Sequence, residues 1–365
     1  MKKYLLCFVF VFGLMALSSG VFAAATDIQF SGYTWFRETG NNKVFGDGQT
    51  NTAKMSVDRS YLTWKLNYED NLAGNITLDL PMKSGTNAKN NDWTTFVKYA
   101  YVDVKNLLPE DGFVRIGVQP TYFAMIDKWS YPLIYKPLED NLGLLSSADL
   151  GVSLQGTLFG GLADYQVAGF GGNGYAMPTE TDNNIATDIA MTVYPIPGLS
   201  IRGSLYNSTV SSGDAYASDG VSAGKWYNGV AANYYWGPLW FMWEGIEGMK
   251  PNSTMSDSFK VSGNSKMVMW TINDRWDLGV REDIYDPDVN NDSAAGTDNT
   301  SNSKQDFMIY GVNYHWANDL LLQLNTSKLA YDGGNQNAGA NPYSPSPSTA
   351  RYTQNETILQ VKWSY

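Results

Sequence analysis

The chain has 365 residues, a formal net charge of −11 and one cysteine. The acidic balance argues against nucleic acid as a partner, because phosphate backbones are bound by clustered Lys and Arg side chains. A single cysteine, Cys7, excludes intrachain disulfides and thiolate metal sites. Aromatic residues make up 14% of the chain, with 24 Tyr and 12 Trp, which are enriched at membrane–water interfaces.

Residues 1–25 predict a secretory signal peptide, which leaves residues 26–365 as the mature domain. Lys2 and Lys3 form its charged region, Leu5 to Leu17 its apolar region, and Val21 to Ala25 offers small-residue cleavage sites. The alternative is a transmembrane anchor, but the apolar run is short and no basic stop-transfer segment follows. Beyond it, no run of 18 apolar residues predicts a membrane-spanning helix.

The mature domain consists of alternating segments of a length that suits tilted strands crossing a bilayer. We predict sixteen strands: Asp27–Glu38, Ser56–Tyr68, Ala73–Leu80, Trp93–Val104, Gly112–Gln119, Asp149–Leu158, Leu162–Gly171, Asn184–Tyr194, Leu199–Thr209, Lys225–Tyr235, Leu239–Gly248, Lys266–Ile272, Arg275–Tyr285, Gln305–Trp316, Leu320–Leu329 and Thr353–Tyr365.

The last strand shows the pattern best. Leu359, Val361, Trp363 and Tyr365 fall on one face and polar residues on the other, with Ile358 as the one apolar intruder. Side chains alternate between faces along a strand, and in transmembrane barrels the apolar face meets lipid while the polar face meets the lumen. The pattern therefore predicts an all-β fold, a single transmembrane antiparallel β-barrel.

The connections between these strands alternate between long and short. Long ones are rich in Gly, Asn, Ser, Asp and Thr, whereas short ones such as 159–161, 195–198 and 236–238 carry Gly, Pro and aromatic residues. Outer-membrane barrels have short periplasmic turns and long external loops. An even strand number then places both termini in the periplasm. Aromatic residues beside the short turns predict an interfacial girdle, although a soluble β-sandwich is the alternative interpretation.

Charged residues opposite the apolar faces should point into the lumen, because a charge facing lipid costs about 2–4 kcal/mol at the bilayer midplane. Lys98 does not fit this parity, which indicates a bulge or an error of register. The third long connection, 120–148, is rich in aromatic and aliphatic residues, so we expect it to fold into the lumen and narrow it; the alternative is packing over the mouth. The candidate pore-lining and constriction residues are Arg37, Arg59, Lys65, Arg115, Arg202, Arg281, Asp127, Glu139 and Asp140.

This organisation resembles the sixteen-stranded porins of Gram-negative outer membranes. Val57 to Trp64 and Val114 to Pro120 further resemble the phosphate-selective branch. The family implies a homotrimer of independent pores in contact with outer-membrane lipid and lipopolysaccharide. The balanced inward charges lack the branch's dense basic ladder, so we expect weak cation preference or little selectivity.

Other motifs do not indicate catalysis or a bound cofactor. The only histidine, His315, lies beside a predicted turn, and a single histidine there gives poor support to a hydrolase, which needs a nucleophile with a partnered base. Asp286 to Asp292 alternates carboxylates but has Asn291 where a calcium loop needs glycine. Glycine-rich residues 169–174 follow no βαβ pattern. We therefore predict no enzyme, no cofactor and no metal site, with a solvated acidic loop at 286–292 or, alternatively, an external divalent-ion site.

The predicted function is an outer-membrane pore for passive diffusion of ions and small hydrophilic solutes. Two alternatives remain. One is a channel that prefers a sugar or an anion such as phosphate, in which Tyr122, Trp129, Tyr131 and Tyr135 stack on sugar rings. The other is a surface adhesin or structural barrel that acts through its long loops.

Overall fold

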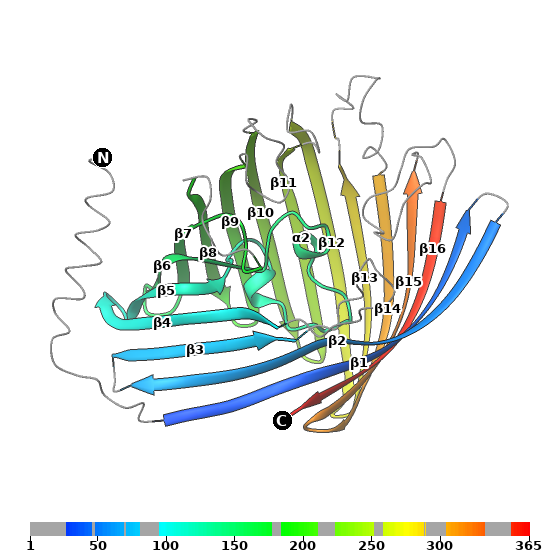
Figure 1. The fold of residues 1–365 in the computed structure, drawn as a ribbon, viewed down its shortest axis with the longest axis horizontal. Coiled ribbons are helices and arrows are strands. Elements are labelled where there is room, and N and C mark those ends of the chain that lie inside the picture. Colours follow the sequence, from blue (N-terminus) through cyan, green and yellow to red (C-terminus); the bar gives the residue numbers. More distant parts are fainter. Residues whose placement is uncertain are drawn as a thin grey trace.

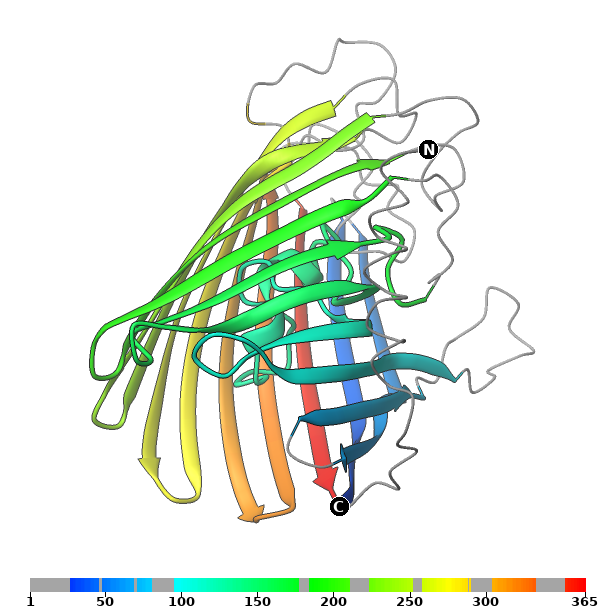
Figure 2. The ribbon, with the colours of Figure 1, turned by 90° about the vertical axis from the view of Figure 1, so that its left-hand side faces the viewer.

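The computed structural model describes residues 27–45, 48–68, 71–80, 95–176, 184–210, 223–251, 258–287, 289, 304–332 and 352–365. The predicted signal peptide lies outside these residues. Sixteen strands form one closed antiparallel barrel in which each strand pairs with its chain neighbours and β1 pairs with β16 (Figures 1 and 2). No helix in these ranges is long and apolar enough to cross a membrane.

All sixteen predicted segments are strands. They are β1 Asp27–Phe45, β2 Gly48–Tyr68, β3 Leu72–Asp79, β4 Phe96–Leu108, β5 Gly112–Pro120, β6 Ala148–Leu158, β7 Ala163–Phe170, β8 Ala186–Ile196, β9 Leu199–Val210, β10 Ala223–Trp236, β11 Leu239–Pro251, β12 Ser258–Asn273, β13 Trp276–Asp286, β14 Lys304–Ala317, β15 Leu320–Asp332 and β16 Tyr352–Ser364. A short 3-10 helix η1 (Ile126–Lys128) and a short helix α2 (Leu138–Asn141) lie between β5 and β6.

Some strands are longer than their apolar pattern. The predicted loop 39–55 is mostly strand, because β1 and β2 stay paired from Glu38 and Met55 out to Phe45 and Gly48. β12 likewise begins eight residues before the predicted Lys266. Beyond the apolar band a strand needs no apolar face, so the period-two signal ends while the backbone ladder continues. The existence of the strands was therefore predictable from the sequence, whereas the outer ends of β1, β2 and β12 were not.

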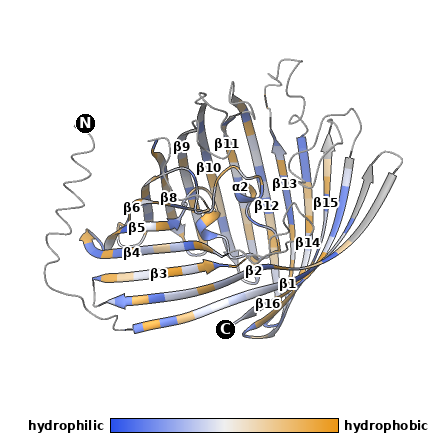
Figure 3. Cartoon of the chain, in the orientation of Figure 1, coloured by the Kyte–Doolittle hydropathy of each residue, from blue (hydrophilic) through white to orange (hydrophobic). Residues whose placement is uncertain are grey.

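The outer face of the wall is largely apolar, with the Lys266–Glu282 ion pair between β12 and β13 as an exception. Leu150, Val152 and Leu154 of β6 and Ile189 and Met191 of β8 are all exposed on this face, and hydrophobic and hydrophilic residues alternate along the strands in Figure 3. The intervening positions carry the polar residues of the inner face, as the period-two pattern predicts. The aromatic residues beside the short turns include the well-exposed Trp236, Trp276, Trp316 and Tyr365.

The two ends of the chain close the barrel. The amide of Gly32 donates to the Tyr365 carbonyl at 2.8 Å, and the Tyr365 amide donates back to Gly32 at 3.0 Å. In β16, Leu359 and Trp363 face outward, whereas Ile358 and Gln360 are buried inside. The apolar intruder of the sequence pattern thus belongs to the inner face.

The irregular parity at Lys98 has a structural cause. The pairing of β3 with β4 shifts register between Thr77 and Leu78, opposite Val97 and Tyr99. The extra residue lets both Lys98 and Tyr99 avoid the outer face. The bulge inferred from the sequence is therefore confirmed.

Gly117 of β5 is expected to tolerate no side chain. Its φ is +129°, and an added Cβ would lie 2.1 Å from the Ala100 carbonyl oxygen of β4. Gly117→Ala should therefore disrupt the β4–β5 ladder and lower the midpoint temperature of barrel unfolding by several degrees. Gly203→Ala is the matched control, since a Cβ there meets nothing within 4 Å; equal midpoints for the two variants would contradict the prediction.

Candidate functional site: loop 3 inside the barrel

Residues 121–147, here called loop 3, lie inside the barrel rather than over its mouth (Figures 1 and 2). The prediction from its apolar composition is confirmed. Phe123 and Leu133 are fully buried, and Tyr122, Leu138 and Leu144 are nearly so. An isolated loop of 27 residues in solvent could not bury such groups, so the wall must receive them.

Loop 3 packs against two apolar areas of the inner wall. The first joins Tyr122, Phe123, Leu138 and Leu144 to wall residues that include Phe170, Tyr206, Tyr227, Ile246 and Val261. The second joins Met125, Trp129 and Leu133 to Met242, Met267, Met269, Phe307 and Ile309. Sequence reasoning missed these inward-facing apolar residues. The available signal was the unbroken run Met267-Val268-Met269-Trp270, which is typical of a strand buried on both faces.

Glycines on the inner wall make room for the loop. A Cβ at Gly311 would lie 2.3 Å from Leu133 Cδ2, and one at Gly279 would lie 2.9 Å from the same atom. A Cβ at Gly263 would lie 2.9 Å from Leu138 Cδ2. Both leucines therefore lie directly against glycines of the wall, and a side chain at these positions would displace the leucine methyl groups.

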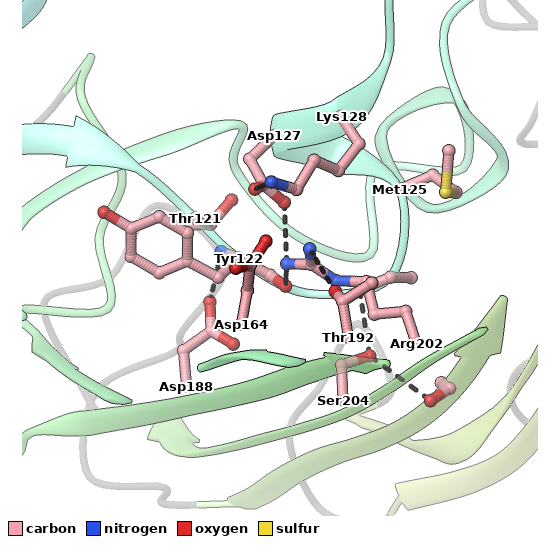
Figure 4. A network of polar contacts seen from close by, with 12 residues as sticks. Thr121, Tyr122, Met125, Asp127, Lys128, Asp164, Asp188, Thr192, Arg202 and Ser204 are labelled. Atoms are coloured by element: carbon pink, nitrogen blue, oxygen red, sulfur yellow. Dashed lines mark hydrogen bonds and ion pairs between the residues drawn. The ribbon is translucent and has the colours of Figure 1, made fainter. Parts of the chain in front are cut away.

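Arg202 of β9 anchors the first half of loop 3. Its guanidinium, which is 2% exposed, forms a salt bridge with Asp127 at 2.8 Å and donates to the Tyr122 carbonyl (Figure 4). Beside it, Asp188 Oδ2 of β8 accepts the Tyr122 amide at 2.6 Å. A buried charge is tolerated when it is paired and hydrogen-bonded, and here the loop supplies the partners.

Arg281 of β13 anchors the middle of loop 3 in the same way. It pairs with Asp283 through two bonds of 2.7 Å, donates to the Lys136 carbonyl at 2.6 Å and lies 4.8 Å from the centre of the Trp129 ring. Like Arg202, Arg281 is buried beneath the loop. Two predicted pore-lining arginines thus lie between the wall and loop 3.

The far edge of loop 3 reaches the opposite wall. Arg59 of β2 donates to the Tyr131 hydroxyl, and the Tyr131 ring meets Trp35 of β1 edge-on at 4.9 Å. Tyr135 donates to Glu356 of β16 at 2.5 Å. Loop 3 is therefore held from several sides of the barrel.

The remaining predicted site residues divide between the wall and the loop. Arg115 pairs with Asp103 on the wall through bonds of 2.7 and 2.9 Å. Arg37 pairs with Asp58 at 2.9 Å, and Asp140 pairs with Lys136 at 2.8 Å within loop 3. Lys65 is exposed and lies nearer the short-turn end of β2 than Arg59 does.

The proposed stacking residues have other partners. Tyr122 is 2% exposed and Trp129 is 8% exposed, and the Trp129 Nε1 donates to the Tyr135 carbonyl at 3.0 Å. These two rings pack loop 3 against the wall, so their faces are not open to a solute. Within the described residues no three His, Cys, Asp or Glu side chains cluster as a metal site would require. Residues 288 and 290–292 of the acidic loop lie outside these ranges.

Two carboxyl groups meet under loop 3. Glu139 of α2 and Glu244 of β11 are both fully buried, and both accept the Met125 amide, at 3.0 and 3.2 Å. Burial and the neighbouring Glu244 raise the pKa of Glu139 well above its usual range.

No protein-family model matches this chain, and no curated protein matches it in sequence. Solved structures do match over almost the whole chain. The outer-membrane channel DcaP of Acinetobacter baumannii has a TM-score of 0.66 at 14% identity, covering 94% of this chain and 99% of that one. OmpT of Vibrio cholerae, in a trimer form, has a TM-score of 0.62 at 13% identity, covering 94% and 100%.

OmpF of Salmonella typhi, in complex with daunomycin, also matches, with a TM-score of 0.62 at 12% identity over 93% of this chain and 97% of that one. At these identities the likeness concerns the fold. The chain has the sixteen-stranded fold of the outer-membrane porins, which confirms the resemblance inferred from the sequence. The resemblance to the phosphate-selective branch stays a prediction.

Raising the pH is expected to loosen loop 3. A carboxyl whose pKa is raised in the folded protein favours the protonated form, so its stabilising effect is present below the ordinary Glu pKa of about 4.3 and is lost as the pH rises towards the raised pKa. Glu139→Gln keeps a donor and removes the ionisation. The thermal midpoint of the wild type should fall more steeply than that of Glu139→Gln from about pH 5 to pH 9.

The exposed Glu38 offers a control, since Glu38→Gln removes a carboxylate that is not buried. Its pH profile should follow that of the wild type. Parallel profiles for the wild type and Glu139→Gln would show that the buried pair does not titrate in this range.

Proposed function

We propose that the protein is a passive diffusion channel of the Gram-negative outer membrane that passes ions and small hydrophilic solutes. The observation that carries this proposal is the pairing of an apolar outer wall with a charged, hydrogen-bonded interior. Leu154 and Trp243 of the outer wall are exposed and apolar, whereas Lys128 and Lys136 on loop 3 expose 42% and 39% of their side chains inside the barrel. A wall of this kind suits lipid outside and water inside.

Loop 3 would act as the constriction. It is held to the wall by buried ion pairs and apolar contacts, so it narrows the interior at a fixed place rather than moving freely. The candidate constriction and pore-lining residues then divide by role. Arg202, Arg281, Glu139, Asp127 and Arg59 hold the loop, while we assign Arg37, Lys65, Arg115 and Asp140 to the water-filled part of the interior.

The same reasoning extends to the setting of the channel. The described strands begin and end at the short-turn end of the barrel, with Asp27 and Ser364, which we assign to the periplasm. One of the similar structures is described as a trimer, and we propose a homotrimer embedded in outer-membrane lipid and lipopolysaccharide. Diffusion through such a pore needs no catalytic residue and no cofactor.

Planar-bilayer recording tests the proposal directly. The purified protein should give stable stepwise conductance, and liposomes that contain it should swell in a manner that depends on solute size. A barrel that inserts without conductance, and whose long-loop deletions abolish attachment to a surface, would favour the adhesin alternative instead.

Freeing loop 3 should change the current. Arg202→Met leaves Asp127 and the Tyr122 carbonyl without their buried partner, and breaking a buried pair costs about 3–5 kcal/mol. Because part of this cost falls on the attachment of loop 3, we expect larger and noisier single-channel currents. Arg275→Met is the control, since Arg275 is exposed beside a short turn; unchanged currents in Arg202→Met would contradict the constriction.

A further inference from the structure

Residues 131–135, here called the apex of loop 3, contact the wall over five consecutive strands of the closed barrel. Their wall partners are Asn313 of β14, Gln323, Asn325 and Ser327 of β15, Glu356 of β16, Trp35 of β1 and Arg59 of β2. The bonds to Asn313, Asn325 and Ser327 are 2.7–3.0 Å long. The apex is therefore attached along an unbroken arc of the wall.

The inner wall behind the apex is sealed from water. Asn325 and Gln360 are fully buried, and Gln323, Asn313 and Ser327 are at most 4% exposed. These are polar side chains on the lumen side of β14, β15 and β16, which water would reach if the apex stood away from the wall. No solute can pass between the apex and these three strands.

The inner face of β4 and β5 is more open. Tyr99, Tyr101 and Arg115 are partly exposed there, although Arg115 is paired with Asp103. On β3, Asn75 faces inward opposite Tyr101 and is also partly exposed. The open part of the lumen therefore borders the wall of β3, β4 and β5.

Tyr131 closes the remaining part of the arc, at β1 and β2. Arg59 donates to its hydroxyl and lies 4.5 Å from the centre of its ring, and the ring meets Trp35 edge-on at 4.9 Å. Trp35 is fully buried and Arg59 is 8% exposed, whereas Tyr131 stays partly exposed. The Tyr131 ring is thus the boundary between this part of the wall and the open lumen.

The backbone of Tyr131 is strained in this position. Its φ is +57°, which a bulky residue rarely adopts, and it precedes Pro132, which favours an extended conformation for the residue before it. Such a conformation persists only where the surroundings over-determine it. Here Gln323 donates to the Tyr131 carbonyl and Asn313 to the Pro132 carbonyl, while Arg59 and Trp35 hold the ring.

We infer that Tyr131 limits the size of the solutes that pass. Its ring closes the lumen between the apex and the strands β1 and β2, and it leaves the passage on the side of β3, β4 and β5. This inference rests on the proposed channel function and names the residue that sets the width of the channel. The ring acts by occupying space, so its effect applies to neutral and charged solutes alike.

Single-channel recording and liposome swelling test the role of the ring. Tyr131→Gly removes the ring, and glycine adopts a positive φ without strain, so the backbone of the apex keeps its path. Conductance should rise at least 1.5-fold, and larger neutral polyethylene glycols should enter the liposomes. Tyr131→Phe keeps the ring and should retain the size limit of the wild type.

Tyr310→Ala is the matched control, because it removes a tyrosine ring that is 52% exposed on the outer face of β14. Its conductance and size limit should equal those of the wild type. An unchanged size limit in Tyr131→Gly would overturn the inference. An equal rise in Tyr131→Phe would overturn it as well, because the hydrogen bond to Arg59 rather than the ring would then set the limit.

Thiol modification tests the side on which solutes pass. Cys7 is the only cysteine of the chain and lies in the predicted signal peptide, so single cysteines can be placed at Asn75 and at Ser327. A bulky neutral thiol reagent should lower the current of Asn75→Cys by at least a third and leave that of Ser327→Cys unchanged. Equal effects, or an effect at Ser327→Cys alone, would overturn the assigned side. Absence of conductance in the wild type would instead refute the channel function.

Discussion

Every backbone polar group of a chain that crosses hydrocarbon has to be paired within the protein, and the rest of this structure depends on that constraint. A closed ladder of sixteen strands meets it, because each strand finds a partner on both sides and the seam between Gly32 and Tyr365 removes the last free edge. Once the ladder is closed, successive side chains of each strand point alternately out of the barrel and into it. One face of every strand must be apolar, and the other is left for the interior.

Loop 3 meets the same requirement by different means. It has no ladder, so side chains of the wall take up its backbone groups. Asp188 accepts the Tyr122 amide, Arg281 donates to the Lys136 carbonyl, and Asn325 accepts the Ile134 amide at 3.0 Å. The charged residues that hold the loop are thereby withdrawn from the solvent.

The sequence was sufficient to predict which residues of the wall face outward. It was insufficient to predict the contacts that the inward-facing residues make. Parity along β16 predicted which residues face outward, since lipid imposes the same rule on every strand. Inside the barrel no such rule applies, because Arg202 faces inward as predicted and yet lies beneath loop 3. Whether an inward arginine anchors loop 3 or lines the pore depends on contacts between residues 75 or more positions apart in the chain, and parity carries no information about them.

The recesses at Gly279 and Gly311 make the wall and the loop complementary in shape. A methyl group at Gly311 would lie 2.3 Å from Leu133 Cδ2, so a larger residue at 311 would require the Leu133 side chain to shift. Among descendants of this chain, a bulkier residue at 311 should be found together with a smaller one at 133, and a loop with a different leucine spacing should be matched by glycines elsewhere on the wall. We therefore expect loop 3 and the inner wall of this barrel to change together in evolution. A loop transplanted into the wall of another barrel would need matching small residues there.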